Sequence, residues 1–173
     1  MLKIKNGLKK RLYQRLRARG DIKDFNPYKN KTMTLNEVQD RIIEDFSVFD
    51  DWMDKYQQLI ELGKDLPPID EKKRTESYLI KGCQSKVWLD AELKDGKIFF
   101  SADSDAIITK GIVALLIQVL NERTPKEILE SELYFIDKIG LKENLSPTRS
   151  NGLVSMVKQM RLFALAYQTK LNS

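Results

Sequence analysis

The sequence predicts an α+β fold with a small three-stranded antiparallel sheet and helices on both sides of it in the chain. Two observations support this prediction. Between residues 77 and 101 the apolar residues are spaced as in strands, and Asp95-Gly96 is a hairpin signal. On both flanks apolar residues recur every three to four positions, which is typical of amphipathic helices. With 173 residues, 42% of them hydrophobic, the chain is long enough for one domain with a substantial core.

Helices are expected from residue 34 onward. Thr34-Leu-Asn-Glu37 has the pattern of a capping box, in which each side chain satisfies a free backbone donor. A further helix is expected between a cap at Ser47 and a stop at Gly63. Its apolar stripe, which we assign to the core, consists of Phe49, Trp52, Met53, Tyr56, Leu59 and Ile60.

Three strands are expected next, at residues 77–80, 86–93 and 97–101. The Asp95-Gly96 turn would join the second strand to the third, and the loop at residues 82–85 would join the first to the second. Strands that follow one another so closely pair as an antiparallel meander.

Helices are expected again after the strands. The stretch Ala106 to Leu120 is apolar almost all round, which predicts a buried central helix capped by Asp103 or Ser104. Thr124-Pro-Lys-Glu127 is a second capping box, with proline at the favoured first helical position. Ser146-Pro147 predicts the start of the last helix, whose apolar stripe consists of Leu153, Met156, Val157, Met160, Phe163, Ala164 and Tyr167.

The residue counts exclude several kinds of chemistry. The chain has no histidine, which excludes Ser-His-Asp and Cys-His catalytic arrangements and zinc sites that need imidazole. Its single cysteine, Cys83, cannot form an intramolecular disulfide or hold a zinc ion or iron–sulfur cluster alone. We therefore expect no metal site. The longest apolar run, residues 112–117, is far shorter than the roughly 20 residues of a membrane span.

The positive charge is concentrated at the start of the chain. Residues 1–32 hold eleven Lys or Arg and two acids, a net +9, whereas the other nineteen basic and twenty-three acidic residues give residues 33–173 a net −4. The basic segment fits a nucleic-acid or membrane-surface arm, an organellar transit peptide, a solvated tail, or an upstream start codon with Met33 as the true start. We favour the last interpretation, and expect residues 1–32 to be an extension outside a folded domain at 33–173.

Cys83 is the candidate for chemistry. A lone cysteine is usually a small buried hydrophobic residue. This one lies in the polar loop Gly82-Cys-Gln-Ser85, between Lys81 and Lys86, and nearby cations favour the reactive thiolate. No base is adjacent in sequence, so a sulfur atom that accepts and passes on a group is more plausible than a self-sufficient catalyst.

Four blocks of sequence carry a family resemblance: Tyr56-Gln-Gln-Leu-Ile-Glu-Leu-Gly-Lys-Asp-Leu-Pro67, Ile80-Lys-Gly-Cys-Gln-Ser-Lys-Val-Trp88, Ala102-Asp-Ser-Asp-Ala-Ile-Ile-Thr-Lys-Gly111 and Leu145-Ser-Pro-Thr-Arg-Ser-Asn-Gly152. They resemble the SufE family of sulfur acceptors, and together they cover roughly residues 34–170. A different class of related protein, the IscU/NifU-like scaffold, needs several cysteines, whereas this chain has one.

The resemblance implies a SufE/NifU-like fold and a role as a carrier, not an enzyme. Cys83 would accept persulfide sulfur from a PLP-dependent, SufS-like cysteine desulfurase, stimulate that enzyme, and pass the sulfur to a SufB-containing scaffold for iron–sulfur cluster assembly. PLP belongs to the partner, and no cofactor is expected on this chain. We further expect a cytoplasmic monomer or weak homodimer that binds neither nucleic acid nor membrane. The alternative is a nucleic-acid or membrane-surface module that acts through the basic arm, with Cys83 structural.

The resemblance also implies roles for residues around Cys83. Arg149 would contact the partner or the cysteine loop, unless it forms an ordinary surface salt bridge. Asp105 matches an acidic position near that loop, although a carboxylate at a helix start is also favoured by the helix dipole. Gln84 and Ser85 would donate hydrogen bonds to a persulfide or serve as turn residues.

The resting Cys83 thiol is expected to turn inward. A persulfide in solvent would be lost to small thiols, so a sheltering apolar wall is expected from Val87, Ile108 and Ile112. Burial there would raise the pKa of the thiol and slow its alkylation. Docking of the desulfurase would then swing the loop outward, with Gly82 as the hinge.

Overall fold

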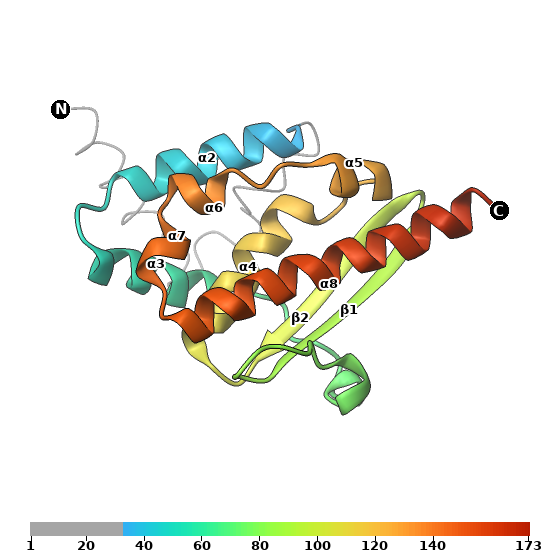
Figure 1. Cartoon of the computed structure of the whole chain (residues 1–173), viewed down its shortest axis with the longest axis horizontal. Coiled ribbons are helices and arrows are strands. Elements are labelled where there is room, and N and C mark those ends of the chain that lie inside the picture. Colours follow the sequence, from blue (N-terminus) through green and yellow to red (C-terminus); the bar gives the residue numbers. More distant parts are fainter. Residues whose placement is uncertain (1–32) are drawn as a thin grey trace, which may run out of the picture.

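The computed structural model of the protein describes residues 33–173 (Figure 1). The predictions for the basic segment 1–32 lie outside this range. No helix in the described part of the chain is long and apolar enough to cross a membrane. The elements are α2 (Leu35–Ser47), α3 (Trp52–Lys64), the 3-10 turns η1 (Glu71–Lys73) and η2 (Glu76–Tyr78), β1 (Val87–Lys94), β2 (Lys97–Ser104), α4 (Ile107–Leu120), α5 (Pro125–Glu130), α6 (Phe135–Lys138), α7 (Leu141–Asn144) and α8 (Pro147–Leu171).

The sheet has two strands in the described residues, and the prediction of a third is wrong. β1 and β2 pair antiparallel around the Asp95-Gly96 turn, from Val87 opposite Ser104 to Lys94 opposite Lys97. The segment 77–80 instead turns through η2, where the Leu79 N–H donates to the Glu76 carbonyl. Its pairing with β1 is reduced to one bridge, Leu79 opposite Trp88. A strand needs several consecutive ladder bonds, and this segment has room for one before the chain turns at Gly82.

Helix α4 is the centre of the molecule, as its apolar sequence predicts. Most of its residues are buried, and it packs against the hairpin and α3, while α8 crosses in front of α4 and the hairpin (Figure 1). Two glycines let α3 and α4 approach at backbone distance. A β-carbon added to Gly111 would lie 2.1 Å from the Leu59 carbonyl oxygen, and one added to Gly63 would lie 2.9 Å from the Gly111 nitrogen. Gly63 therefore serves close packing as well as lying near the end of its helix.

Helix caps agree with the sequence where the capping residues are close neighbours. Both capping boxes are present, at Thr34 and Thr124, and Ser146 caps α8. The predicted cap at Ser47 is wrong, because Ser47 ends α2 and Asp51 caps α3.

Two further details of the helical prediction are also wrong. The N-cap of α4 is Ala106, without a side-chain cap, although the Ala106 N–H donates to the Ser104 hydroxyl at 3.2 Å. Met53, assigned to the core from the apolar stripe, is 74% exposed.

A charged cluster anchors the segment that leads to the cysteine loop. The Asp103 carboxylate is buried and pairs with Arg74 and with Lys110, whose Nζ lies 3.1 Å away. The Arg74 guanidinium also lies over the Trp88 ring, 5.3 Å from its centroid. The cluster joins residues 71–80 to the hairpin and to α4, and so fixes the base of the loop that follows.

Candidate functional site

The loop that carries Cys83 is held at both ends by backbone hydrogen bonds. The Ile80 N–H donates to the Val87 carbonyl at 2.8 Å, and the Lys86 N–H donates to the Asp105 carboxylate at 3.0 Å. Between these points the chain turns at Gly82, whose φ of +90° is one that residues with a side chain rarely adopt. The result is a short, pinned loop that presents Cys83 to α8.

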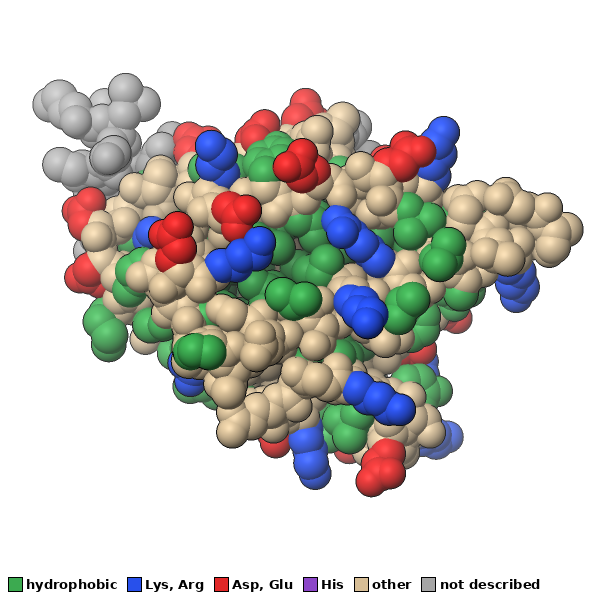
Figure 2. Space-filling model, viewed as in Figure 1, with side chains coloured by type: hydrophobic (Ala, Val, Ile, Leu, Met, Phe, Trp, Pro, Cys, Tyr) green, Lys and Arg blue, Asp and Glu red, His purple; other side chains and the backbone are tan. Residues whose placement is uncertain are grey.

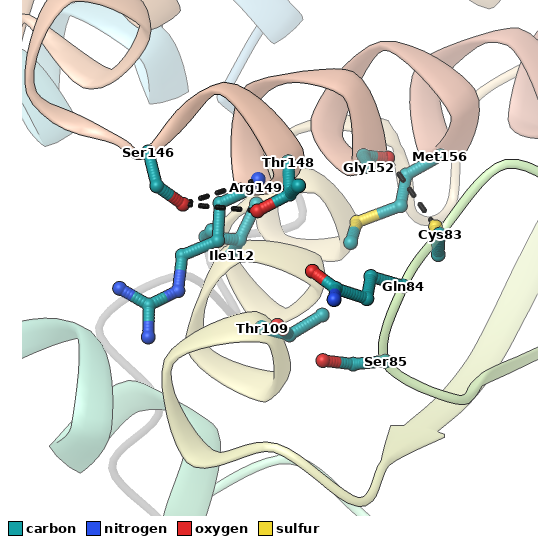
Figure 3. A pocket seen from close by; sticks show the side chains of 10 residues that line it. All are labelled: Cys83, Gln84, Ser85, Thr109, Ile112, Ser146, Thr148, Arg149, Gly152 and Met156. Atoms are coloured by element: carbon teal, nitrogen blue, oxygen red, sulfur yellow. Dashed lines mark hydrogen bonds between the residues drawn. The ribbon is translucent and has the colours of Figure 1, made fainter.

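Cys83 is half-buried against α8, and its thiol lies 3.6 Å from the Gly152 carbonyl oxygen, to which it donates (Figure 3). Gly152 lies close to the sulfur: a β-carbon added to it would be 3.6 Å from Sγ, an ordinary van der Waals contact. Burial raises the pKa of the Cys83 thiol, because desolvation disfavours the thiolate. The resting group is therefore a sheltered thiol.

A cavity of about 330 Å³ opens beside this thiol. Its walls come from the cysteine loop, from α4 and from the first turns of α8 (Figure 3). Most of its lining side chains are polar and none is a carboxylate. The lining residues are Cys83, Gln84, Ser85, Thr109, Ile112, Ser146, Thr148, Arg149, Gly152 and Met156.

The structure brings most of the predicted site residues together. Gln84, Ser85 and Arg149 line the same cavity as Cys83, although Arg149 lies 66 positions further along the chain. Arg149 forms no ion pair with another described residue, so the surface salt bridge considered above is absent from residues 33–173. Asp105 does not line the cavity and instead accepts the hydrogen bond from the backbone of residue 86.

The wall around the thiol is only partly the predicted one. Of the three wall residues expected from sequence, Ile112 lines the cavity, whereas Val87 and Ile108 do not. The Sγ atom faces α8 instead, at Gly152 and Met156. Gly152 and Thr109 both lie in blocks that resemble a known family, Leu145–Gly152 and Ala102–Gly111, and the sequence could have indicated them on that ground. Met156 carries no signal in the sequence that separates it from core residues.

The surroundings of the cavity are basic on one side. Helix α8 contains no acidic residue in its 25 positions and carries Arg149, Lys158, Arg161 and Lys170. Figure 2 shows Lys and Arg side chains among hydrophobic ones on the band that α8 crosses, while acidic side chains gather along the upper edge, over α2. A negatively charged molecule is thus favoured over a positively charged one near the first turns of α8.

Residues 33–173 contain no cluster of three or more Cys, Asp or Glu side chains that could hold a metal ion. The chemistry that these residues offer is that of the Cys83 sulfur and of the hydrogen-bond donors around it.

Comparison with known proteins identifies a family. A family model, the SufE Fe-S metabolism associated domain, matches residues 40–164. An uncharacterized SufE-like protein of Synechocystis is 42% identical over 128 residues, which cover 74% of this chain and 80% of the relative. An uncharacterized SufE-like protein of Rhizobium etli is 45% identical over 127 residues, or 70% of this chain and 86% of the relative.

A solved structure has the same fold. The solution structure of a hypothetical protein from Thermus thermophilus superposes with a TM-score of 0.64 and covers 76% of this chain and 96% of that one. The two sequences are 22% identical, so this likeness shows the fold alone.

Proposed function

The chain belongs to the SufE family, and from this premise we propose that it is a sulfur carrier of iron–sulfur metabolism that works through Cys83. The observation that carries the proposal is the placement of the chain's single thiol: half-buried in a pinned loop, at the edge of a polar cavity. A lone thiol suits a carrier, because a second thiol nearby would release the sulfur by forming a disulfide.

The proposed donor is a SufS-like cysteine desulfurase that carries sulfur as a persulfide on its own cysteine. The Cys83 thiolate attacks the outer sulfur of that persulfide. A new S–S bond forms at Cys83, the S–S bond on the donor breaks, and its electron pair leaves with the donor cysteine as thiolate, as in thiol–disulfide exchange. No outside oxidant or reductant is needed. PLP stays on the desulfurase.

The proposed partner also controls when Cys83 reacts. In the resting state the thiol faces the Gly152 carbonyl and burial raises its pKa, so the reactive thiolate is scarce at neutral pH. Docking of the desulfurase would swing the loop outward about Gly82 and expose the sulfur. The bond from the Lys86 N–H to the Asp105 carboxylate holds the other end of the loop, which makes Asp105 a positioning residue for the loop.

Delivery to a SufB-containing scaffold and stimulation of the desulfurase complete the proposed role. Arg149 and the α8 face that bears it are the proposed contact with the partner, since they are basic and lie beside Cys83. Because no histidine is present and no base contacts Sγ among residues 33–173, turnover by this chain alone is not expected.

The test is transfer of sulfur to the purified chain. It is mixed with a PLP-dependent cysteine desulfurase and cysteine, and its mass is measured without reductant. We expect a gain of one sulfur atom on Cys83 and none on Cys83→Ser, whose thermal unfolding should match the wild type. As a matched control, Cys83→Ser combined with Ser85→Cys keeps one thiol two residues away, and it should accept far less sulfur. Equal sulfur gain by Cys83→Ser would refute the proposal, and unfolding of that variant would favour a structural cysteine.

A further inference from the structure

The cavity beside Cys83 is lined by a hydroxyl without a protein partner among residues 33–173. Thr109 is 6% exposed and lines the cavity, yet its hydroxyl makes no hydrogen bond to any residue from 33 to 173. By contrast, the hydroxyl of another helical threonine, Thr169 on α8, donates to the Leu165 carbonyl four residues earlier in the chain. The Thr109 hydroxyl is not among the side-chain atoms of residues 33–173 that are both buried and unpaired, so it is open to the cavity that it lines. Thr109 therefore offers a hydrogen-bond donor to a polar ligand atom in the cavity.

The opposite side of the cavity supplies an unpaired cation. The Arg149 guanidinium has no ion pair or hydrogen bond with another described residue. It offers a planar fork of N–H donors, which matches the two oxygens of a carboxylate or a sulfur oxyanion. No Asp or Glu is among the lining residues, so nothing in the lining competes for this charge.

Other donors line the same cavity. The hydroxyl of Ser85 and the amide of Gln84 line the cavity and have no hydrogen-bond partner among residues 33–173. The first turn of α8, capped by Ser146, adds the positive end of a 25-residue helix. The unpartnered groups therefore include an Arg, an amide and two hydroxyls from three separate elements.

We propose that this cavity is a binding site for a small oxyanion, either the carboxylate of a small organic acid or an inorganic sulfur oxyanion such as sulfate. At about 330 Å³ the cavity is at the lower end of small-molecule sites, so the ligand is small. Figure 3 shows Arg149 and Ser146 at one end, Cys83 and Met156 at the other, and Gln84, Thr109 and Ser85 between them. The charged group binds at the Arg149 end and any sulfur-bearing or apolar remainder extends toward Cys83. This site goes beyond sulfur carriage and does not depend on it.

Occupancy of the site has a measurable effect on Cys83. An anion beside the thiol disfavours the thiolate, and each unit that the thiol pKa rises lowers the thiolate fraction about tenfold at a pH below that pKa. The assay is alkylation of Cys83 by iodoacetamide in the full chain, at fixed pH and ionic strength, with chloride replaced by sulfate or by acetate. We expect a severalfold slower reaction in at least one of the two anions.

Variants separate this site from general salt effects and from the basic segment 1–32. Arg149→Gln and Thr109→Val should lose the slowing, whereas Thr109→Ser, which keeps the hydroxyl, should retain it. Lys81→Gln removes the same charge near Cys83 but outside the cavity, and should show the wild-type ratio of rates. Thermal unfolding of each variant checks that the fold persists.

Two results would overturn the proposal: no slowing by either anion, or equal slowing in the wild type, Arg149→Gln and Thr109→Val. The two arms distinguish the sources. Slowing by sulfate alone assigns the site to inorganic sulfur oxyanions, and slowing by acetate alone assigns it to organic carboxylates. Slowing by both supports the shared oxyanion chemistry. None of these results depends on a desulfurase. The oxyanion site can therefore be refuted while sulfur transfer to Cys83 is confirmed, and sulfur transfer can be refuted while the oxyanion site is confirmed.

Discussion

Replacing Gly82 by alanine should destabilise the cysteine loop for two separable reasons. The φ of Gly82 is +90°, and a residue with a β-carbon pays about 1–2 kcal/mol in the left-handed region. In addition, the new β-carbon would lie 2.5 Å from the Ser155 hydroxyl oxygen. Displacing that side chain from its rotamer adds about 0.5–1.5 kcal/mol. The expected loss in free energy of unfolding is therefore about 1.5–3.5 kcal/mol, the sum of these two costs.

Two comparisons isolate these contributions. Gly96 also has a positive φ, +76°, but a β-carbon there would meet nothing within 4 Å, so Gly96→Ala measures the backbone cost alone. Combining Gly82→Ala with Ser155→Ala removes the close oxygen and leaves the Ser155 β-carbon at 3.5 Å, an ordinary contact. The double variant should recover the steric part of the loss and no more.

The assays are thermal unfolding and alkylation of Cys83. At about 2–4 °C per kcal/mol for a chain of this size, Gly82→Ala should lower Tm by about 3–14 °C, and Gly96→Ala by roughly half as much. Alkylation should accelerate in Gly82→Ala and stay unchanged in Gly96→Ala, because only the first displaces the loop. Equal Tm losses in the two variants would refute the role of Ser155. A wild-type Tm in both would refute the strained backbone.

Three further outcomes are expected. The pH-rate profile for alkylation of Cys83 should have its midpoint above that of a cysteine in an unfolded peptide, because burial raises the thiol pKa. The contribution of the neutral thiol to folding stability is complete below the unfolded-state pKa and is lost as pH rises through the folded-state pKa. A midpoint at the peptide value would contradict this prediction. Asp105→Ala should speed alkylation severalfold and lower the free energy of unfolding by about 1 kcal/mol, because the Lys86 N–H loses its acceptor. An unchanged alkylation rate would show that this bond does not hold the loop. Truncation to residues 33–173 should preserve Tm and sulfur acceptance, because the capping box at Thr34 is complete within that range, and a Tm several degrees lower would show that residues 1–32 pack on the domain.

Local patterns in the sequence predicted the features that depend on neighbouring residues. The capping boxes at Thr34 and Thr124 and the cap at Ser146 join groups three positions apart, so their signature can be recognised without a fold. The hairpin around Asp95-Gly96 and the buried helix α4 follow in the same way from a turn signal and from an unbroken apolar stretch. The candidate thiol needed only the count of cysteines and the polarity of its loop.

Contacts between residues that are far apart in the chain determine the features that the sequence did not predict. The α3–α4 contact at Gly111 determines which residues of α3 are buried, and so leaves Met53 in solvent despite its place in the apolar stripe. The first predicted strand is instead a turn, because the Leu79 N–H bonds back to Glu76 and only one bridge to β1 forms before the chain turns at Gly82.

The site itself is the clearest case. Cys83 meets Gly152, 69 positions along the chain, and shares a cavity with Arg149 and Thr109. The spacing of apolar residues reports which face of an element is buried, but not which element covers it. That choice depends on how α8 lies across α4 and the hairpin, and this arrangement turns a lone cysteine into a sheltered thiol beside a polar, carboxylate-free cavity.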